Sequence, residues 1–107
     1  MTDGFIKIAR TDEIGMGAMR CLRIDERPIL VANVGGLYYA VSATCSHEEV
    51  SLCTGALKGE VVKCPLHGSR FDIRTGAPLE GPAEQPLAVY PVRVDGDDIL
   101  VGLHPTP

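Results

Sequence analysis

The sequence predicts an all-β fold, a small barrel or sandwich, and three observations support this prediction. Short β-prone runs recur at both ends of the chain, and no window holds an apolar stripe of helical period longer than two turns. Twelve glycines and eight prolines among 107 residues supply many turns. The hydrophobic share of 45% argues against disorder, and the length is that of one domain.

The N-terminal part of the chain is predicted to hold four strands joined by tight turns. Asp25-Glu26-Arg27 separates two β-prone runs and indicates a hairpin. Gly35-Gly36 then turns the chain into the next strand. The expected strands cover residues 5–9, 18–24, 28–34 and 37–41.

The C-terminal part is predicted to add two more strands, at 88–94 and 99–103. Asp95-Gly96-Asp97-Asp98 lies between them, and its Asp-Gly dipeptide is a strong turn signal. We therefore expect residues 1–41 and 87–107 to form one base β domain.

Residues 42–86 differ from both ends. They hold three of the four cysteines and two of the three histidines, with two short β-prone runs at 60–63 and 70–73. A long loop-rich insertion in a small β domain is usually functional. The segment has too few apolar residues to form a second large core, so we expect something else to hold it together.

Two short motifs in this insertion predict a metal centre. Cys45-Ser46-His47 and Cys64-Pro65-Leu66-His67 each supply one thiolate and one imidazole. Zinc sites use similar pairs, usually with both cysteines in one motif and both histidines in the other. The mixed arrangement also allows the cysteines to serve one iron and the histidines a second, as in a Rieske [2Fe–2S] centre.

With the residues that follow these motifs, the chain resembles the Rieske iron–sulfur domain, and most closely the small Rieske-type ferredoxins of bacterial multicomponent oxygenases. The resemblance implies a loop-rich cluster-binding subdomain at 42–86 with one [2Fe–2S] cluster. Cys45 and Cys64 are implied to bind the buried iron, and His47 and His67 the outer iron. The residues that carry the rest of the resemblance are Gly68, Ser69, Phe71, Asp72, Gly76, Gly81 and Pro82. Of these, Gly68, Ser69, Phe71 and Pro82 are expected to surround the ligands.

The function that the resemblance implies is one-electron transfer. The expected donor is a flavin-containing reductase and the expected acceptor a terminal oxygenase, and the chain itself is expected not to be an enzyme. Two alternatives stay open from the sequence. A Rieske-like small subunit of assimilatory nitrite reductase often lacks ligands, whereas all four are present here. A structural zinc module would use the same four residues without redox chemistry.

Four residues predict a reduction potential at the low end of the Rieske range. Leu66 stands where high-potential respiratory Rieske proteins have a disulfide cysteine, and Phe71 stands where they have a tyrosine hydroxyl that donates to sulfur. Glu48 and Glu49 add negative charge after His47. Fewer donors to sulfur and more nearby anions both lower the potential.

Charge and hydropathy exclude other partners. A net charge of −4 argues against binding a nucleic-acid backbone. No run approaches the roughly 18 apolar residues of a membrane span, and no signal peptide is visible, so we expect a cytoplasmic protein. In that compartment Cys21 is expected to be a small buried residue and Cys53 an unligated loop thiol, with no disulfide between them.

Overall fold

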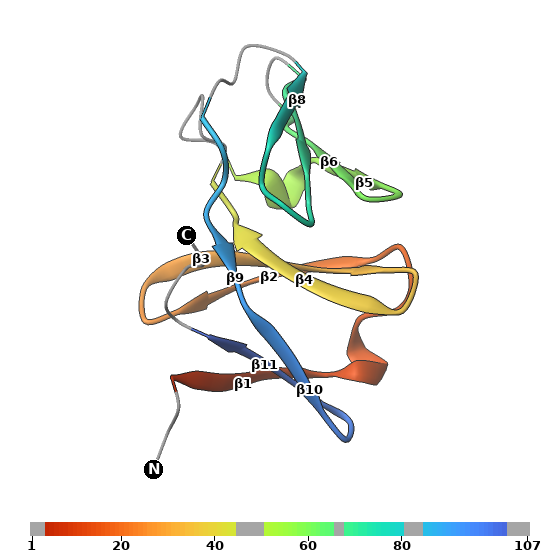
Figure 1. Ribbon diagram of the computed structural model, residues 1–107, viewed down its shortest axis with the longest axis vertical. Coiled ribbons are helices and arrows are strands. Elements are labelled where there is room, and N and C mark those ends of the chain that lie inside the picture. The colour runs from red at the N-terminus through yellow and green to blue at the C-terminus, as the bar shows by residue number, and fades with distance from the viewer. Residues whose placement is uncertain (1–3, 45–50, 66–67, 81–84, 103–107) are drawn as a thin grey trace.

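The computed structural model describes residues 4–44, 51–65, 68–80 and 85–102, which form three antiparallel sheets (Figure 1). The first sheet has the order β1 (Phe5–Arg10), β11 (Asp98–Gly102), β10 (Val92–Asp95). The second has the order β2 (Met19–Ile24), β3 (Arg27–Val34), β4 (Leu37–Ser42), β9 (Val89–Tyr90). The third has the order β5 (Ala56–Lys58), β6 (Val61–Lys63), β7 (Arg70–Asp72), β8 (Pro78–Glu80). The all-β prediction is confirmed.

The described helices are two 3₁₀ turns, η1 (Thr11–Glu13) and η2 (Leu52–Thr54). Within the described ranges, the structure contains no helix with the length and apolar character needed to cross a membrane.

The second sheet lies in the middle of the molecule and is buried on both faces (Figure 1). Successive side chains of a strand point to opposite faces, so Ile29 and Val31 join the core shared with the first sheet. Leu30 and Ala32 join the core on the other side. This double burial explains why residues 29–32 are apolar without interruption.

The predicted turns of this sheet are confirmed. Asp25 and Glu26 have φ values of 54° and 66°, and Gly35 and Gly36 have 62° and 94°. Two residues with positive φ match the right-handed twist of the flanking strands, as in type I′ hairpins. Two neighbouring hairpins, β2–β3 and β3–β4, therefore set the register of the sheet.

The single strand predicted at 88–94 is wrong. Pro91 has no N–H to donate and divides the run into β9, which pairs with β4, and β10, which pairs with β11. The carbonyl of Pro91 instead accepts a hydrogen bond from the Gly102 N–H at 2.9 Å. The proline thus carries the chain from the second sheet to the first.

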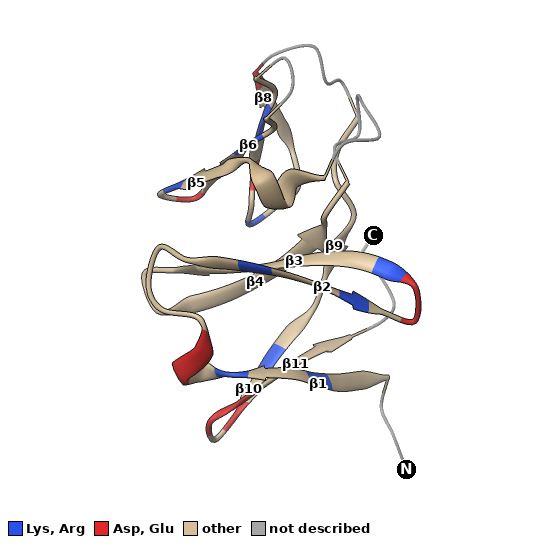
Figure 2. Ribbon diagram, turned by 180° about the vertical axis from the view of Figure 1, so that it is seen from behind, with Lys and Arg blue, Asp and Glu red and all other residues tan. Residues whose placement is uncertain are grey.

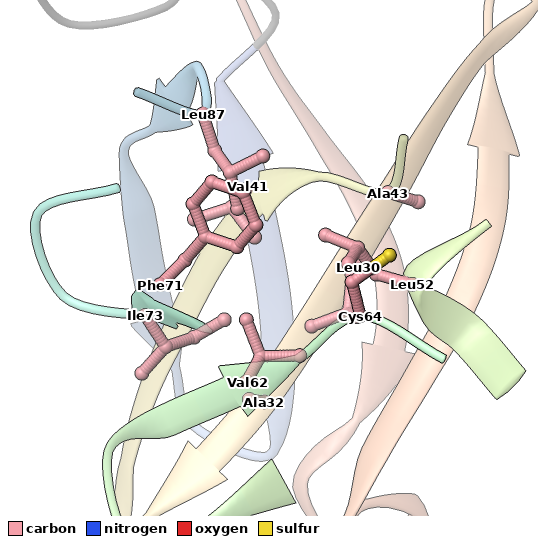
Figure 3. Close-up of a cluster of buried hydrophobic side chains, with 10 residues drawn as sticks. All are labelled: Leu30, Ala32, Val41, Ala43, Leu52, Val62, Cys64, Phe71, Ile73 and Leu87. Carbon is pink, nitrogen blue, oxygen red and sulfur yellow. The ribbon is translucent and has the colours of Figure 1, made fainter. Parts of the chain in front are cut away.

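The third sheet does not stand apart from the rest of the protein. It packs on the second sheet through a cluster of buried side chains (Figure 3). The middle segment contributes to a large core, but it completes that core jointly with β3 and β4 rather than by itself. The cluster consists of Leu30, Ala32, Val41, Ala43, Leu52, Val62, Cys64, Phe71, Ile73 and Leu87.

Candidate metal centre

The four predicted ligands differ in how far the structure describes them. Cys64 lies among the described residues, whereas Cys45, His47 and His67 lie outside them, as does Pro82. With only one of the four described, the described part of the chain gathers no group of three potential metal ligands. What the structure does describe is the chain on both sides of each motif.

Cys64 follows β6 and is almost completely buried, with 1% of its surface exposed. Its backbone N–H donates to the carbonyl oxygen of Ser69 at 2.7 Å. This bond lies next to Lys63 and Arg70, which form the last pair of the β6–β7 ladder. The second motif therefore spans a short loop whose two ends are fixed to each other.

Gly68 supplies the backbone shape that this loop needs before it enters β7. Its φ of 73° lies in the left-handed region that side chains with a Cβ rarely adopt. The expectation that Gly68 lets backbone amides approach a cluster remains a prediction.

The first motif also begins and ends on a closed stem. Thr44 and Ser51 form an isolated antiparallel bridge, and the Leu52 N–H donates to the carbonyl of Ala43 at 2.6 Å. The chain thus leaves the end of β4 at Thr44 and returns beside it at Ser51. Cys45 is the residue directly after this stem begins.

A close backbone approach brings the two stems together. Gly55, just after η2, lies so near the Lys63 carbonyl that a Cβ on residue 55 would collide with that oxygen. The chain after the first motif thereby touches the strand that ends immediately before Cys64. A surface hollow of about 390 Å³ opens at this junction, between Gly55 and Ala56 on one side and Cys64 and Gly68 on the other.

These features fit a metal centre that is held by both motifs. One thiol is already buried at the edge of the apolar core, and both loop stems lie at the same end of the molecule, near η2 and β6 (Figure 1). Thiolate and imidazole together suit zinc or an iron–sulfur cluster better than magnesium or calcium. The residues present therefore fit a Rieske cluster.

Two of the residues predicted to surround the ligands point into the protein. Ser69 and Phe71 are fully buried on either side of the exposed Arg70. The Phe71 ring packs near Val41 and Leu87 in the cluster drawn in Figure 3. Phe71 is thus a core residue, and its expected influence on a ligand sulfur remains a prediction.

An ion pair braces the turn after β7. No pattern in the sequence had predicted it. The guanidinium of Arg74 donates to both carboxylate oxygens of Asp72, at 3.2 and 3.1 Å, and lies 3.3 Å from Glu60. The side-chain hydrogen bond from Arg74 is the main cause that holds the pKa of Asp72 below its usual value, and the same contact raises the pKa of Arg74. The brace ties the β7 end to the β5–β6 turn.

Cys21 and Cys53 form a disulfide, with Cα atoms 5.9 Å apart. The expectation that this bond is absent is therefore wrong, and Cys21 is half-buried rather than buried. The two residues are 32 positions apart, so no local pattern predicts the pair. They meet because β2 and η2 pack against the same side of the core.

Comparison with known proteins decides the family. A model of the Rieske [2Fe–2S] domain matches residues 4–91. The chain belongs to the Rieske [2Fe–2S] domain family. The cofactor of this family is a [2Fe–2S] cluster, which fits the cysteine and histidine donors and the two loop stems described above.

Curated relatives are similar along most of the chain. The ferredoxin component of biphenyl 2,3-dioxygenase from Rhodococcus jostii (strain RHA1) is 43% identical over 100 residues, covering 92% of each chain. The ferredoxin subunit of 3-phenylpropionate/cinnamic acid dioxygenase from Escherichia coli (strain K12) is 45% identical over 84 residues, covering 77% of this chain and 79% of the relative.

Solved Rieske ferredoxins share the fold. The ferredoxin of carbazole 1,9a-dioxygenase from Nocardioides aromaticivorans IC177 is 37% identical, with a TM-score of 0.89 over 94% of this chain and 98% of that one. A chain from a complex of reduced oxygenase and oxidised ferredoxin in carbazole 1,9a-dioxygenase is 32% identical, with a TM-score of 0.93 over 99% of both chains.

The chain is thus a Rieske-type ferredoxin, an electron carrier and not itself a catalytic enzyme. The two alternatives that the sequence left open, the nitrite reductase subunit and the structural zinc module, are not favoured. The relatives are ferredoxin components of dioxygenases.

Proposed function

We propose that this Rieske ferredoxin takes single electrons from a flavin-containing reductase and delivers them to a terminal oxygenase that acts on an aromatic ring. One observation carries the proposal. A chain 32% identical to this one along 99% of its length comes from a complex of an oxygenase and a ferredoxin. The ferredoxin components of biphenyl and phenylpropionate dioxygenases support the same class of acceptor.

The cluster ligands are proposed to be Cys45, His47, Cys64 and His67. Support comes from the closed stem at Thr44 and from the buried Cys64, each of which lies directly at its motif. A [2Fe–2S] cluster with two thiolates and two neutral imidazoles takes up one electron at about −150 to +300 mV, against about −400 mV for plant-type ferredoxins.

The two kinds of ligand have different tasks in this proposal. Cys64 anchors its end of the site in the apolar core, where water is excluded. His47 and His67 are proposed to bind the outer iron and to offer the edge through which the electron leaves. Contacts between redox partners are typically small and short-lived, so docking at this edge is expected to be weak.

Residues 42–86 are proposed to act as the cluster-binding unit, carried by a base made of 1–41 and 87–107. The third sheet lies entirely within 42–86, which supports this division. A cytoplasmic location stays part of the proposal. The Cys21–Cys53 disulfide is unusual for that location, because disulfides in the cytoplasm are rare and are usually transient or redox-sensing.

Anaerobic mixing tests the proposed function. The reduced nicotinamide cofactor and a flavin-containing dioxygenase reductase are expected to bleach the visible absorbance of the chain within seconds, and addition of an oxidised ring-hydroxylating oxygenase is expected to restore it. The Cys64→Ser protein serves as the control and should show neither change. A holoprotein that no such reductase reduces, although dithionite does, would contradict the role as carrier.

A further inference from the structure

The Cys21–Cys53 disulfide lies outside the proposed ligand set, and the function as electron carrier does not use it. We propose that Cys21 and Cys53 form a second redox site, a dithiol–disulfide couple that exchanges with thiol reductants and controls how firmly the first ligand loop is held. The consequence for the loop rests on the proposed function, because it takes Cys45 and His47 as ligands.

The bond joins two separate parts of the structure. Cys21 lies in β2, the outer strand of the second sheet, opposite Leu30 of β3. Cys53 lies in η2, where its N–H is capped by the Ser51 side chain at 3.1 Å. The separation of 5.9 Å between their Cα atoms lies in the usual range for a disulfide. The crosslink thus ties η2 to the edge of the base sheet.

Both cysteines are partly exposed and line a surface hollow, so we expect a small thiol to reach the bond between them. Cys21 and Cys53 are only half-buried, whereas Cys64 is 1% exposed. The pair borders a surface hollow of about 410 Å³ that is also lined by Arg23 and Thr44. An accessible bond of this kind is the type that exchanges, in contrast to a bond sealed in a core.

The exchange balances with a dithiol as the reductant. A thiolate of the reductant attacks one sulfur of the Cys21–Cys53 bond, forms a mixed disulfide and releases the other cysteine as a thiolate, which takes up a proton. The second thiol of the reductant then attacks the mixed disulfide, closes the disulfide of the reductant and releases the other protein thiol. Two electrons and two protons pass to the protein.

The position of η2 connects this exchange to the metal centre. Cys53 is two residues beyond Ser51, whose bridge to Thr44 closes the stem of the first motif. With the bond intact, the stem is held by that bridge, by the buried Leu52 and by the crosslink to β2. Reduction removes the crosslink. We therefore expect the reduced protein to lose its cluster faster.

Counting thiols tests the existence of the site without reference to the cluster. Holoprotein purified in air is unfolded in guanidinium with a chelator and iodoacetamide, and its mass is measured. Two alkylated cysteines are expected, mapped to Cys45 and Cys64, and four after prior treatment with dithiothreitol. Alkylation of Cys21 and Cys53 in the untreated protein would overturn the proposal.

Cluster retention tests the coupling. Loss of visible absorbance to an iron chelator is followed with and without dithiothreitol, in the wild type and in the Cys21→Ser/Cys53→Ser protein. The wild type is expected to lose its cluster several-fold faster with dithiothreitol. The double variant should match the reduced wild type under both conditions, which controls for attack of dithiothreitol on the cluster.

Two results would overturn the coupling: a wild-type rate that dithiothreitol does not change, or an equal acceleration in the double variant. A purified chain that carries no iron would instead contradict the proposed ligand set. The thiol count would still decide whether the second redox site exists.

Discussion

The backbone N–H of Cys64 lies 2.7 Å from the carbonyl oxygen of Ser69, and this bond closes the second motif where β6 ends and β7 begins. Thr44 and Ser51 close the first motif in the same manner. Each pair of proposed ligands is therefore carried by a loop whose stem is part of a sheet or of its extension. Backbone bonds thus hold the described ends of both motifs, Thr44 and Ser51 for the first and Cys64 and Ser69 for the second.

Replacing a cysteine ligand is expected to abolish the cluster. Cys64→Ser and Cys45→Ser each remove one of two thiolates, so bound iron should fall from about two per chain to near zero. The thermal midpoint should fall by roughly 10 °C or more, since a bound group stabilises only the folded state. Cys53→Ser is the control for iron content, because Cys53 lies outside the proposed ligand set, and it should still bind iron. Full visible absorbance in Cys45→Ser would contradict the ligand assignment.

Phe71→Tyr is expected to raise the reduction potential. A hydroxyl here could donate to a ligand sulfur, and about 1 kcal/mol of preference for the reduced state corresponds to about 40 mV for one electron. Phe71→Leu is the control, because it changes the packing of the same core without adding a donor. Protein-film voltammetry measures both. An unchanged or lower potential in Phe71→Tyr would mean that the hydroxyl does not reach sulfur.

Gly55→Ala is expected to destabilise the protein at the junction of the two motifs. The new Cβ would collide with the Lys63 carbonyl, so η2 or β6 must move, at a cost of about 2 kcal/mol, or roughly 10 °C in the thermal midpoint. Gly15→Ala is the control, since its Cβ would meet no atom within 4 Å. Equal midpoints for the two variants would show that the close approach is unimportant.

The Asp72–Arg74 contact predicts a specific dependence of stability on pH. Because the contact lowers the pKa of Asp72 in the folded protein, its stabilisation is present above the ordinary value of 3.8 and is lost as the pH falls through the lowered value. Asp72→Asn should therefore cost about 1 kcal/mol at neutral pH, with the difference from wild type shrinking toward pH 3.

Circular dichroism melts between pH 7 and pH 3 measure this difference. Asp25→Asn, in the exposed β2–β3 turn, serves as the control. A difference between wild type and Asp72→Asn that stays constant down to pH 3 would contradict the assigned contact.

Local sequence patterns were sufficient for the hairpins and for the family. The positive-φ turns at Asp25-Glu26 and Gly35-Gly36 and the two metal motifs depend on neighbours in the chain, so they can be read from residue order. The strands β5 and β8 were not predicted, because each holds a single leucine and no β-branched or aromatic residue, unlike the equally short β6 and β7.

Features that depend on which distant segments pack together left no such signal in the local sequence. The split at Pro91 depends on which sheet receives each half of the run, and a sequence shows the proline without showing the two partners. The Cys21–Cys53 bond requires η2 to pack on the edge of β2, which follows from the core around Leu52 and not from the spacing of the cysteines. The Asp72–Arg74–Glu60 contact likewise needs the β5–β6 turn beside β7.

The electron paramagnetic resonance spectrum of the purified protein, as isolated and after reduction by dithionite, tests the central claim most directly. The account predicts a silent oxidised sample and a reduced sample with the low average g value of a [2Fe–2S] centre bound by histidine and cysteine. A colourless protein that stays silent after dithionite and carries one zinc would contradict it.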